Sequence, residues 1–162
     1  MIFSERVIVL GYALFLLYTF YMDLKIKKLH QCAKIPTFAH ATDAGIDFYA
    51  LEALTVAPMT RAQVGTGIAV QIPDGYVGLV WDKSGLSHKK GLKTLGGVID
   101  AGYRGEVFIG VINLSAEPIT FEAGDKVAQM LIQKVEHPNI VEVEELSDAD
   151  RGIGAFGSTG AK

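Results

Sequence analysis

The chain of 162 residues has the length of one domain, a formal net charge of −3 and one cysteine, Cys32. Its basic residues form no long run, so nucleic acid is not an expected partner. A single cysteine excludes an intrachain disulfide and fits the reducing cytoplasm, and we expect its thiol to be buried. The histidines lie far apart and none has zinc-ligand spacing to the cysteine. No zinc site built from protein side chains alone is therefore expected.

Residues 1–22 form an apolar N-terminal extension, of which residues 7–22 carry no charge. This run is slightly short for a spanning helix and lacks the features of a signal peptide. If it did span a membrane, Lys25, Lys27 and Lys28 would keep the remainder on the cytoplasmic side. An alternating strand pattern starts directly after Met22. We favour a dispensable extension, or a true start at Met22, over a membrane anchor that would tether the protein facing the cytoplasm.

From Asp23 on, short β-type runs alternate with turns rich in Gly, Pro and Asp, which predicts one all-β domain of sandwich or jelly-roll type. We expect at most a short turn of helix after Ser84. The β domain covers residues 23–147, and residues 148–162 form a Gly-rich arm that is mobile until it binds something. The predicted strands are residues 24–29, 46–50, 63–72, 76–81, 97–100, 107–113, 119–121 and 127–135.

Residues 96–107 contain an acid, a tight turn and an aromatic ring in succession. Asp100 ends an apolar run, Gly102 is expected to supply a positive φ to the turn, and Tyr103 follows it. A buried carboxylate held near water suits a general base, and a ring can select sugars or bases by contact. The alternative is a hairpin in which Asp100 only caps the turn.

The Gly-rich arm contains the pattern G-x-G-x-x-G over residues 152–157. A dinucleotide fold is not expected, because no helix and no ribose-binding acid follow before Lys162, and a P-loop would need a lysine after Gly157. Backbone N–H groups, Arg151 and the hydroxyls of Ser158 and Thr159 can still bind phosphate. Phe156 offers a face for a base. A solvated, disordered arm is the alternative.

Five segments in order resemble the homotrimeric, all-β family of dUTP diphosphatases (dUTPases): residues 43–50, 78–86, 97–105, 124–130 and 151–160. One such motif is weakly specific, but five with agreeing spacing are strongly specific, and together they cover nearly everything after Met22. The resemblance implies a distorted jelly-roll or β-clip fold. It also implies a homotrimer whose sites are shared between subunits, so that a lone monomer is inactive.

The resemblance implies hydrolysis of dUTP to dUMP and diphosphate with Mg²⁺, which limits uracil in DNA and supplies dUMP for dTMP synthesis. Asp100 would activate the attacking water, and Tyr103 would lie against the deoxyribose and exclude a 2′-hydroxyl. Asp47 would help to hold the metal through water. A triphosphate needs its charge neutralised, which a metal together with Lys83 and Arg151 can provide. The remaining implied substrate contacts are the uracil edge (Gly97, Val98, Ile99), uracil stacking (Phe156) and the phosphates (Lys83, Ser84, Gly85, Gln129, Arg151, Gly157, Ser158).

Several positions depart from the family's pattern. Lys83 stands where an arginine is usual, which keeps the charge but loses the bidentate geometry. Ala155 and Gly102 replace a usual Gly and Asp, and residues 92–96 hold no Asn to read uracil. Asp47 could instead be a turn acid, and Gln129 could serve only as a buried hydrogen-bonding group.

Two other functions use the same fold. A dCTP deaminase, or a bifunctional relative, shares much of the third motif, but the position that matches its catalytic Glu is Gly110. A non-catalytic nucleotide-binding or regulatory module would be expected to lack Asp100 or the Gly-rich arm, and both are present. Hydrolysis of dUTP is therefore the preferred interpretation.

Overall fold

The computed structural model describes residues 5–10, 13–18, 22–150 and 152–153, the first two ranges by their backbone only. As predicted, these residues form an all-β structure with one short helix. In chain order the elements are β1 (Glu5–Leu10), β2 (Ala13–Tyr18), β3 (Lys25–Lys28), β4 (Ile46–Tyr49), β5 (Leu54–Val56), β6 (Arg61–Val64), β7 (Ile68–Gln71), β8 (Tyr76–Asp82), α1 (Ser84–Lys90), β9 (Leu92–Leu95), β10 (Val98–Ile99), β11 (Ile109–Asn113), β12 (Ile119–Phe121) and β13 (Lys126–Lys134).

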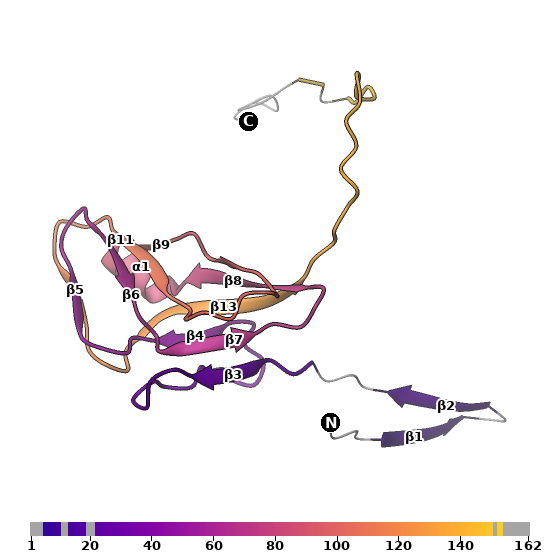
Figure 1. Ribbon diagram of the computed structural model, residues 1–162, viewed down its shortest axis with the longest axis horizontal. Helices are drawn as coiled ribbons and strands as arrows, with labels where there is room; N and C mark the ends of the chain where they lie inside the picture. The colour runs from indigo at the N-terminus through magenta and orange to yellow at the C-terminus, as the bar shows by residue number, and fades with distance from the viewer. Residues whose placement is uncertain (1–4, 11–12, 19–21, 151, 154–162) are drawn as a thin grey trace.

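The largest sheet has the strand order β10-β8-β13-β4, and a three-stranded sheet has the order β6-β11-β9. Two-stranded sheets pair β12 with β5 and β3 with β7. Apolar side chains from all of these sheets meet in one buried cluster, in which Phe48, Phe121 and Met130 are at most 2% exposed. Burying a side chain of this size contributes about 1.5–3 kcal/mol. The core thus holds β8 and β13 firmly in the middle of the body (Figure 1).

The predicted strand over residues 63–72 is wrong as one element. The chain leaves β6 at Val64 and enters β7 at Ile68, so the two strands join different sheets. Gly67 has a φ of +64°, and the Thr66 hydroxyl donates to the Val107 carbonyl at 2.7 Å. A glycine at positive φ breaks the extended conformation that a continuous strand needs. The short strands β5 and β9 were not predicted either.

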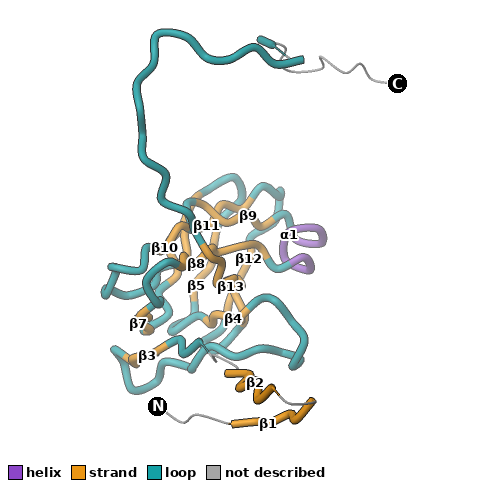
Figure 2. The backbone as a smooth tube through the Cα atoms, turned by 90° about the vertical axis from the view of Figure 1, so that its right-hand side faces the viewer, coloured by secondary structure: helices purple, strands orange, loops and turns teal. Residues whose placement is uncertain are grey.

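Helix α1 is longer than the short turn expected after Ser84, since it runs for seven residues. Gly91 ends it in the left-handed conformation, with φ +70°, and its N–H bonds the Ser87 carbonyl at 3.0 Å. His88, Lys89 and Lys90 occupy the last turn, where positive charge favours a helix end. Figure 2 shows α1 on the side of the body away from the departing C-terminal segment.

The hairpin of β1 and β2 and the described segment after β13 extend away from the body (Figure 1). Strands β1 and β2 pair with each other in an antiparallel hairpin. Among the residues that the structure describes, no helix is long and apolar enough to cross a membrane. Cys32 is exposed, so the expectation of a buried thiol is wrong. After β13 the described chain is free of helix and strand, and Ile140 and Leu146 are largely exposed.

One carboxylate is buried among the strands. Asp47 in β4 is only 2% exposed, its Oδ1 accepts a hydrogen bond from Lys83, and Lys126 Nζ lies 2.6 Å from its Oδ2. The Lys126 contact is ionic, because among the described groups Oδ2 finds no hydrogen-bond donor in good geometry. Burial by itself raises the pKa of Asp47, but the contacts with Lys126 and Lys83 outweigh it and hold the pKa below its usual value.

Acid should therefore remove stability that this carboxylate provides. A carboxyl group whose pKa is lower in the folded than in the unfolded protein stabilises the fold at pH values above its unfolded-state pKa, which is about 3.9. That stabilisation is lost as the pH falls through the folded-state pKa. We expect the free energy of unfolding to fall more steeply between about pH 5 and pH 2 in the parent than in Asp47→Asn, by urea titration at each pH. Asp74→Asn, which alters an exposed carboxylate, should keep the parent's slope. Parallel curves for the parent and Asp47→Asn would contradict the prediction.

Candidate functional site

The hairpin predicted around Asp100 is present, although its turn differs from the prediction. Ile99 in β10 lies opposite Gly78 in β8, and the Tyr103 N–H closes the turn on the Asp100 carbonyl at 3.0 Å. Gly102 does not have a positive φ, so that expectation is wrong. The Arg104 side chain donates to the carbonyls of Ala101 and Tyr103, at 2.5 and 2.7 Å, and braces the turn.

Positive φ occurs instead just before the strand, at Gly97, with φ +105°. The Gly97 carbonyl accepts a 2.8 Å bond from Val80 N–H, and a Cβ at Gly97 would lie only 2.8 Å from the Val80 carbonyl oxygen. Only glycine satisfies both conditions. Gly97 therefore sets the direction in which Val98 and Ile99 enter the sheet, and with it the position of Asp100.

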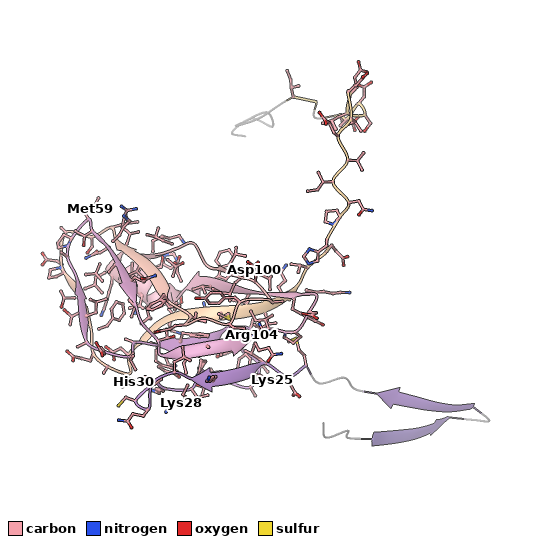
Figure 3. The ribbon with its side chains drawn as sticks, viewed as in Figure 1. Lys25, Lys28, His30, Met59, Asp100 and Arg104 are labelled. Carbon is pink, nitrogen blue, oxygen red and sulfur yellow. The ribbon has the colours of Figure 1, made fainter. Side chains whose placement is uncertain are left out.

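Tyr103 is held by its neighbours on the hairpin. Its hydroxyl donates to the Glu106 carbonyl at 2.8 Å. The Glu106 carboxylate accepts from the N–H groups of Thr66 and Gly67, at 3.0 and 2.8 Å, which ties the hairpin to the turn between β6 and β7. Sequence reasoning did not identify Glu106, although it directly follows the third motif. Figure 3 labels Asp100 and Arg104 toward the end of the body from which the C-terminal segment departs.

Asp100 lies on the wall of an open hollow of about 260 Å³. Asp100 is exposed, so the expectation of a buried carboxylate is wrong for the single chain. Tyr103 is 42% exposed on the same hollow. A carboxylate and a ring facing one small cavity can act together on a nucleoside-sized ligand. The hollow is lined by Gln63, Val98, Ile99, Asp100, Tyr103, Glu106 and Phe108.

A second group of predicted residues meets where β8 ends and α1 begins. Lys83 directly precedes the helix, and Ser84 and Gly85 open it with their surfaces exposed. Gln129 in β13 lies opposite Asp47 and is half-buried. Its Nε2 donates to the Asp82 carbonyl at 2.8 Å, which fits the structural role left open for it.

The approach of Gln129 to β4 depends on Gly45. A Cβ at Gly45 would lie 2.2 Å from the Gln129 Oε1 atom, far inside contact distance. Any larger residue at position 45 would push the amide away from the Asp82 carbonyl. The glycine of the first motif therefore leaves the space that the Gln129 side chain of the fourth motif occupies.

Asp82 fixes the turn that leads into Lys83. Its Oδ1 accepts from the Thr94 N–H and hydroxyl, both at 2.7 Å, and its Oδ2 accepts from Lys93 Nζ at 2.8 Å. Burial alone raises the pKa of Asp82, but Lys93 and Thr94 outweigh it and lower the pKa below its usual value. The carboxylate thereby links the end of β8 to β9. Sequence reasoning missed this residue too.

The proposed metal contact at Asp47 can be tested against its surroundings. Two ammonium groups already compensate the carboxylate, and no group of three or more His, Cys, Asp or Glu side chains that could hold a metal occurs in the described residues. A cation beside two lysines is unfavourable unless other anions are present. The site therefore fits a hydrated Mg²⁺ only together with phosphates, which would supply most of its ligands and attract the lysines.

The hairpin residues around Asp100 and the second group around Lys83 lie far apart within one chain. Ile99 is opposite Gly78, so Asp100 falls beside Val77, whereas Lys83 follows the other end of β8. At about 3.3 Å per residue, the strand from Val77 to Lys83 spans roughly 20 Å. This is much longer than a triphosphate. The single chain brings Asp100 together with Tyr103, and Lys83 together with Gln129 and Asp47, but it does not join the two groups.

The predicted contacts of the C-terminal arm lie outside the described residues. They are Arg151, Phe156, Gly157 and Ser158.

Known proteins are similar to this chain over most of its length. The family model described as dUTPase matches residues 31–160. The deoxyuridine 5′-triphosphate nucleotidohydrolase of Corynebacterium glutamicum is 47% identical over 140 residues, which cover 85% of this chain and 94% of the relative. The protein of the same name from Thermobifida fusca is 44% identical over 140 residues, covering 85% of this chain and 78% of the relative.

Solved structures of phage dUTPases have the same fold. A variant of the Staphylococcus bacteriophage 80alpha dUTPase with dUpNHpp superposes with a TM-score of 0.81 at 32% identity, covering 85% of this chain and 98% of that one. A dUTPase variant from phage phi11 of S. aureus, described with a structural Mg(II) ion, gives a TM-score of 0.71 at 32% identity, covering 76% and 97% of the two chains. With relatives this similar over most of their length, the chain belongs to the dUTPase family.

Proposed function

We propose that this protein hydrolyses dUTP to dUMP and diphosphate. The observation that carries the proposal is the hairpin that holds Asp100 and Tyr103 on one hollow, inside a chain of the dUTPase family. This reaction keeps uracil out of DNA and provides dUMP for dTMP synthesis. A cytoplasmic location suits a substrate drawn from the nucleotide pool.

In this proposal Asp100 accepts a proton from the water whose oxygen attacks the α-phosphorus, and the bond to the oxygen that bridges to the β-phosphate breaks. Tyr103 lies against the deoxyribose and leaves no room for a 2′-hydroxyl. The backbone of Gly97, Val98 and Ile99 pairs with the uracil edge. The bond from Tyr103 to the Glu106 carbonyl and the turn bond to the Asp100 carbonyl limit the motion of both groups.

Lys83, Ser84, Gly85 and Gln129 bind the phosphates in this proposal. A hydrated Mg²⁺, with Asp47 contacting one of its waters, adds charge compensation across the triphosphate when it is bound. From the C-terminal arm, Arg151, Gly157 and Ser158 contact the phosphates and Phe156 stacks on uracil. Lysine at position 83 keeps the charge of the usual arginine but offers a single ammonium instead of a fork.

We propose further that the site is completed in a homotrimer. Asp100 and Lys83 lie at opposite ends of β8, roughly 20 Å apart along the strand, so one chain cannot offer both to one triphosphate. A second subunit would supply the phosphate-binding group. It would also cover Asp100, which the isolated chain leaves exposed.

The deaminase alternative needs an acid where the chain has Gly110. That residue lies in β11 opposite Leu95 and Gln63, and a Cβ there would lie 3.0 Å from the Leu95 carbonyl oxygen. An acid is thus missing and a side chain would be crowded. Incubating the purified protein with Mg²⁺ and dUTP, dCTP, dTTP or UTP separates the reactions. We expect diphosphate from dUTP, whereas ammonia from dCTP would support the deaminase and no product would support a binding module.

Asp100→Asn should reduce turnover of dUTP by about 10²–10⁴-fold, because the amide cannot accept the proton and general-base catalysis is typically worth that much. Binding of dUpNHpp should change little, since the amide keeps the shape of the side chain. Steady-state kinetics and calorimetry measure the two effects, with Asp74→Asn as the control for loss of an exposed carboxylate. Turnover near the parent rate would exclude Asp100 as the base.

Tyr103→Ala should reduce the discrimination between dUTP and UTP by about tenfold or more, because the ring is the proposed barrier to a 2′-hydroxyl. The matched control is Tyr103→Phe, which keeps the ring and removes only the hydroxyl that bonds the Glu106 carbonyl. It should keep most of the discrimination. The ratio of kcat/KM for the two nucleotides is the measurement. An unchanged ratio in Tyr103→Ala would show that another group selects the sugar.

Mixed trimers test the shared site. Protein truncated after Asp150 should fold and assemble but turn over dUTP slowly, because the arm is proposed to close over the phosphates. Re-annealing it with Asp100→Asn protein should give activity above the sum of the two parents, since one subunit can supply the acid and another the arm. Native mass spectrometry must confirm mixed trimers in the sample. Mixed trimers without restored activity would argue against sharing.

A further inference from the structure

Lys126 has no role in the function proposed above, although it contacts a buried residue of the phosphate-binding group. Its Nζ lies 2.6 Å from Asp47 Oδ2 while Lys83 bonds Oδ1, so one carboxylate lies between two ammonium groups. The lysine side chains are 26% and 42% exposed for Lys83 and Lys126, whereas that of Asp47 is 2% exposed. Contact with Asp47 also raises the pKa of Lys126. The carboxylate thus has two partners, both of which can reach solvent.

A β-bulge brings Lys126 to this position. Gln129 pairs with Asp47 and Ala128 with Phe48, but Lys126 pairs with Tyr49, so the register slips by one residue between Lys126 and Ala128. Without the slip, Val127 would be opposite Tyr49. Residues directly opposite each other share a face, and alternate residues of a strand share one too. The bulge therefore turns the lysine side chain to the face of β4 that carries Asp47.

We propose that Lys126 is a positioning residue for nucleotide binding, which allows Lys83 to exchange its carboxylate partner for a phosphate. This inference rests on the proposed function, in that it assumes a triphosphate at Lys83, Ser84 and Gly85. In the free chain Asp47 holds both lysines. When phosphate binds, Lys83 turns to it, and Lys126 alone keeps the buried carboxylate paired.

The physical reason is the cost of an unpaired buried charge. A carboxylate that is almost fully buried and loses its only cation is strongly destabilised, because water cannot replace the partner. In a chain without Lys126, Lys83 would be the only cation in contact with Asp47 among the described residues, and each phosphate contact it made would leave Asp47 without that partner. Lys126 removes this competition. The ammonium of Lys83 lacks the fork of N–H donors by which an arginine could contact a carboxylate and a phosphate together, so the second lysine matters more than beside an arginine.

The test is the binding of dUpNHpp by calorimetry in EDTA, so that any contact of Asp47 with metal does not contribute. Lys126→Met should weaken this binding by at least about tenfold. In separate steady-state kinetics with dUTP and Mg²⁺, it should raise KM and leave kcat close to the parent's. Lys126→Arg keeps the charge and should bind like the parent. Lys134→Met is the matched control, since it removes an exposed lysine from the far end of the same strand and should have little effect.

Removing the buried charge supplies the decisive comparison. In Asp47→Asn no carboxylate needs a partner, so adding Lys126→Met to that variant should weaken dUpNHpp binding by less than about threefold. The double variant contains no unpaired buried carboxylate and remains informative even if Lys126→Met alone does not fold. A tenfold loss in the double variant would show direct contact of Lys126 with phosphate and overturn the proposal. Parent-like binding by Lys126→Met would overturn it as well. Failure of the parent itself to bind dUpNHpp both in EDTA and with Mg²⁺ would contradict the proposed function instead.

Discussion

The arrangement of the site depends on strand β8, which hydrogen-bonds to β10 along one edge and to β13 along the other. Near its start β8 pairs with β10 and fixes Asp100, while along its length it pairs with β13 and fixes Gln129 and the entry to Lys83. Strand geometry is nearly invariant at about 3.3 Å per residue, so the distance between the two groups cannot adjust. This rigidity separates Asp100 from Lys83 within one chain, and in the proposed function a second subunit joins them.

Carboxylates that are buried (Asp47) or half-buried (Asp82 and Glu106) provide the local rigidity on which both groups rely. Glu106 ties the Asp100 hairpin to the turn before β7, Asp82 ties the end of β8 to β9, and Asp47 gathers Lys83 and Lys126. Each carboxylate has charged or N–H partners, as groups removed from water require. The partners differ in kind. Glu106 is held by backbone N–H groups that cannot leave, whereas Asp47 is held by flexible lysines that can, which makes the second arrangement suited to exchange on binding an anion.

The sequence indicated the fold class reliably because its signals are local. Turns with Gly, Pro and Asp punctuate short β-type runs, and most predicted strands are present within a few residues of their predicted ends. It was less successful where the outcome depends on non-local contacts. Residues 63–72 read as one strand, but the Thr66 hydroxyl bonds the distant Val107 carbonyl and the chain turns there. Gly102 resembles a turn glycine with positive φ, yet that conformation is found at Gly97, where β10 crosses close to Val80.

The sequence by itself determined the family, because five motifs in order constrain which residue types occur and at what spacing. It also placed Asp100 and Tyr103 on one hairpin, since a turn of that length leaves little freedom. Only the tertiary structure decided that Asp100 and Lys83 lie at opposite ends of β8, that Asp47 is buried between two lysines, and that Lys126 reaches it. These features follow from strand pairing and from a one-residue bulge in β13. Register between distant strands is set by packing of the whole domain, and no local pattern encodes it.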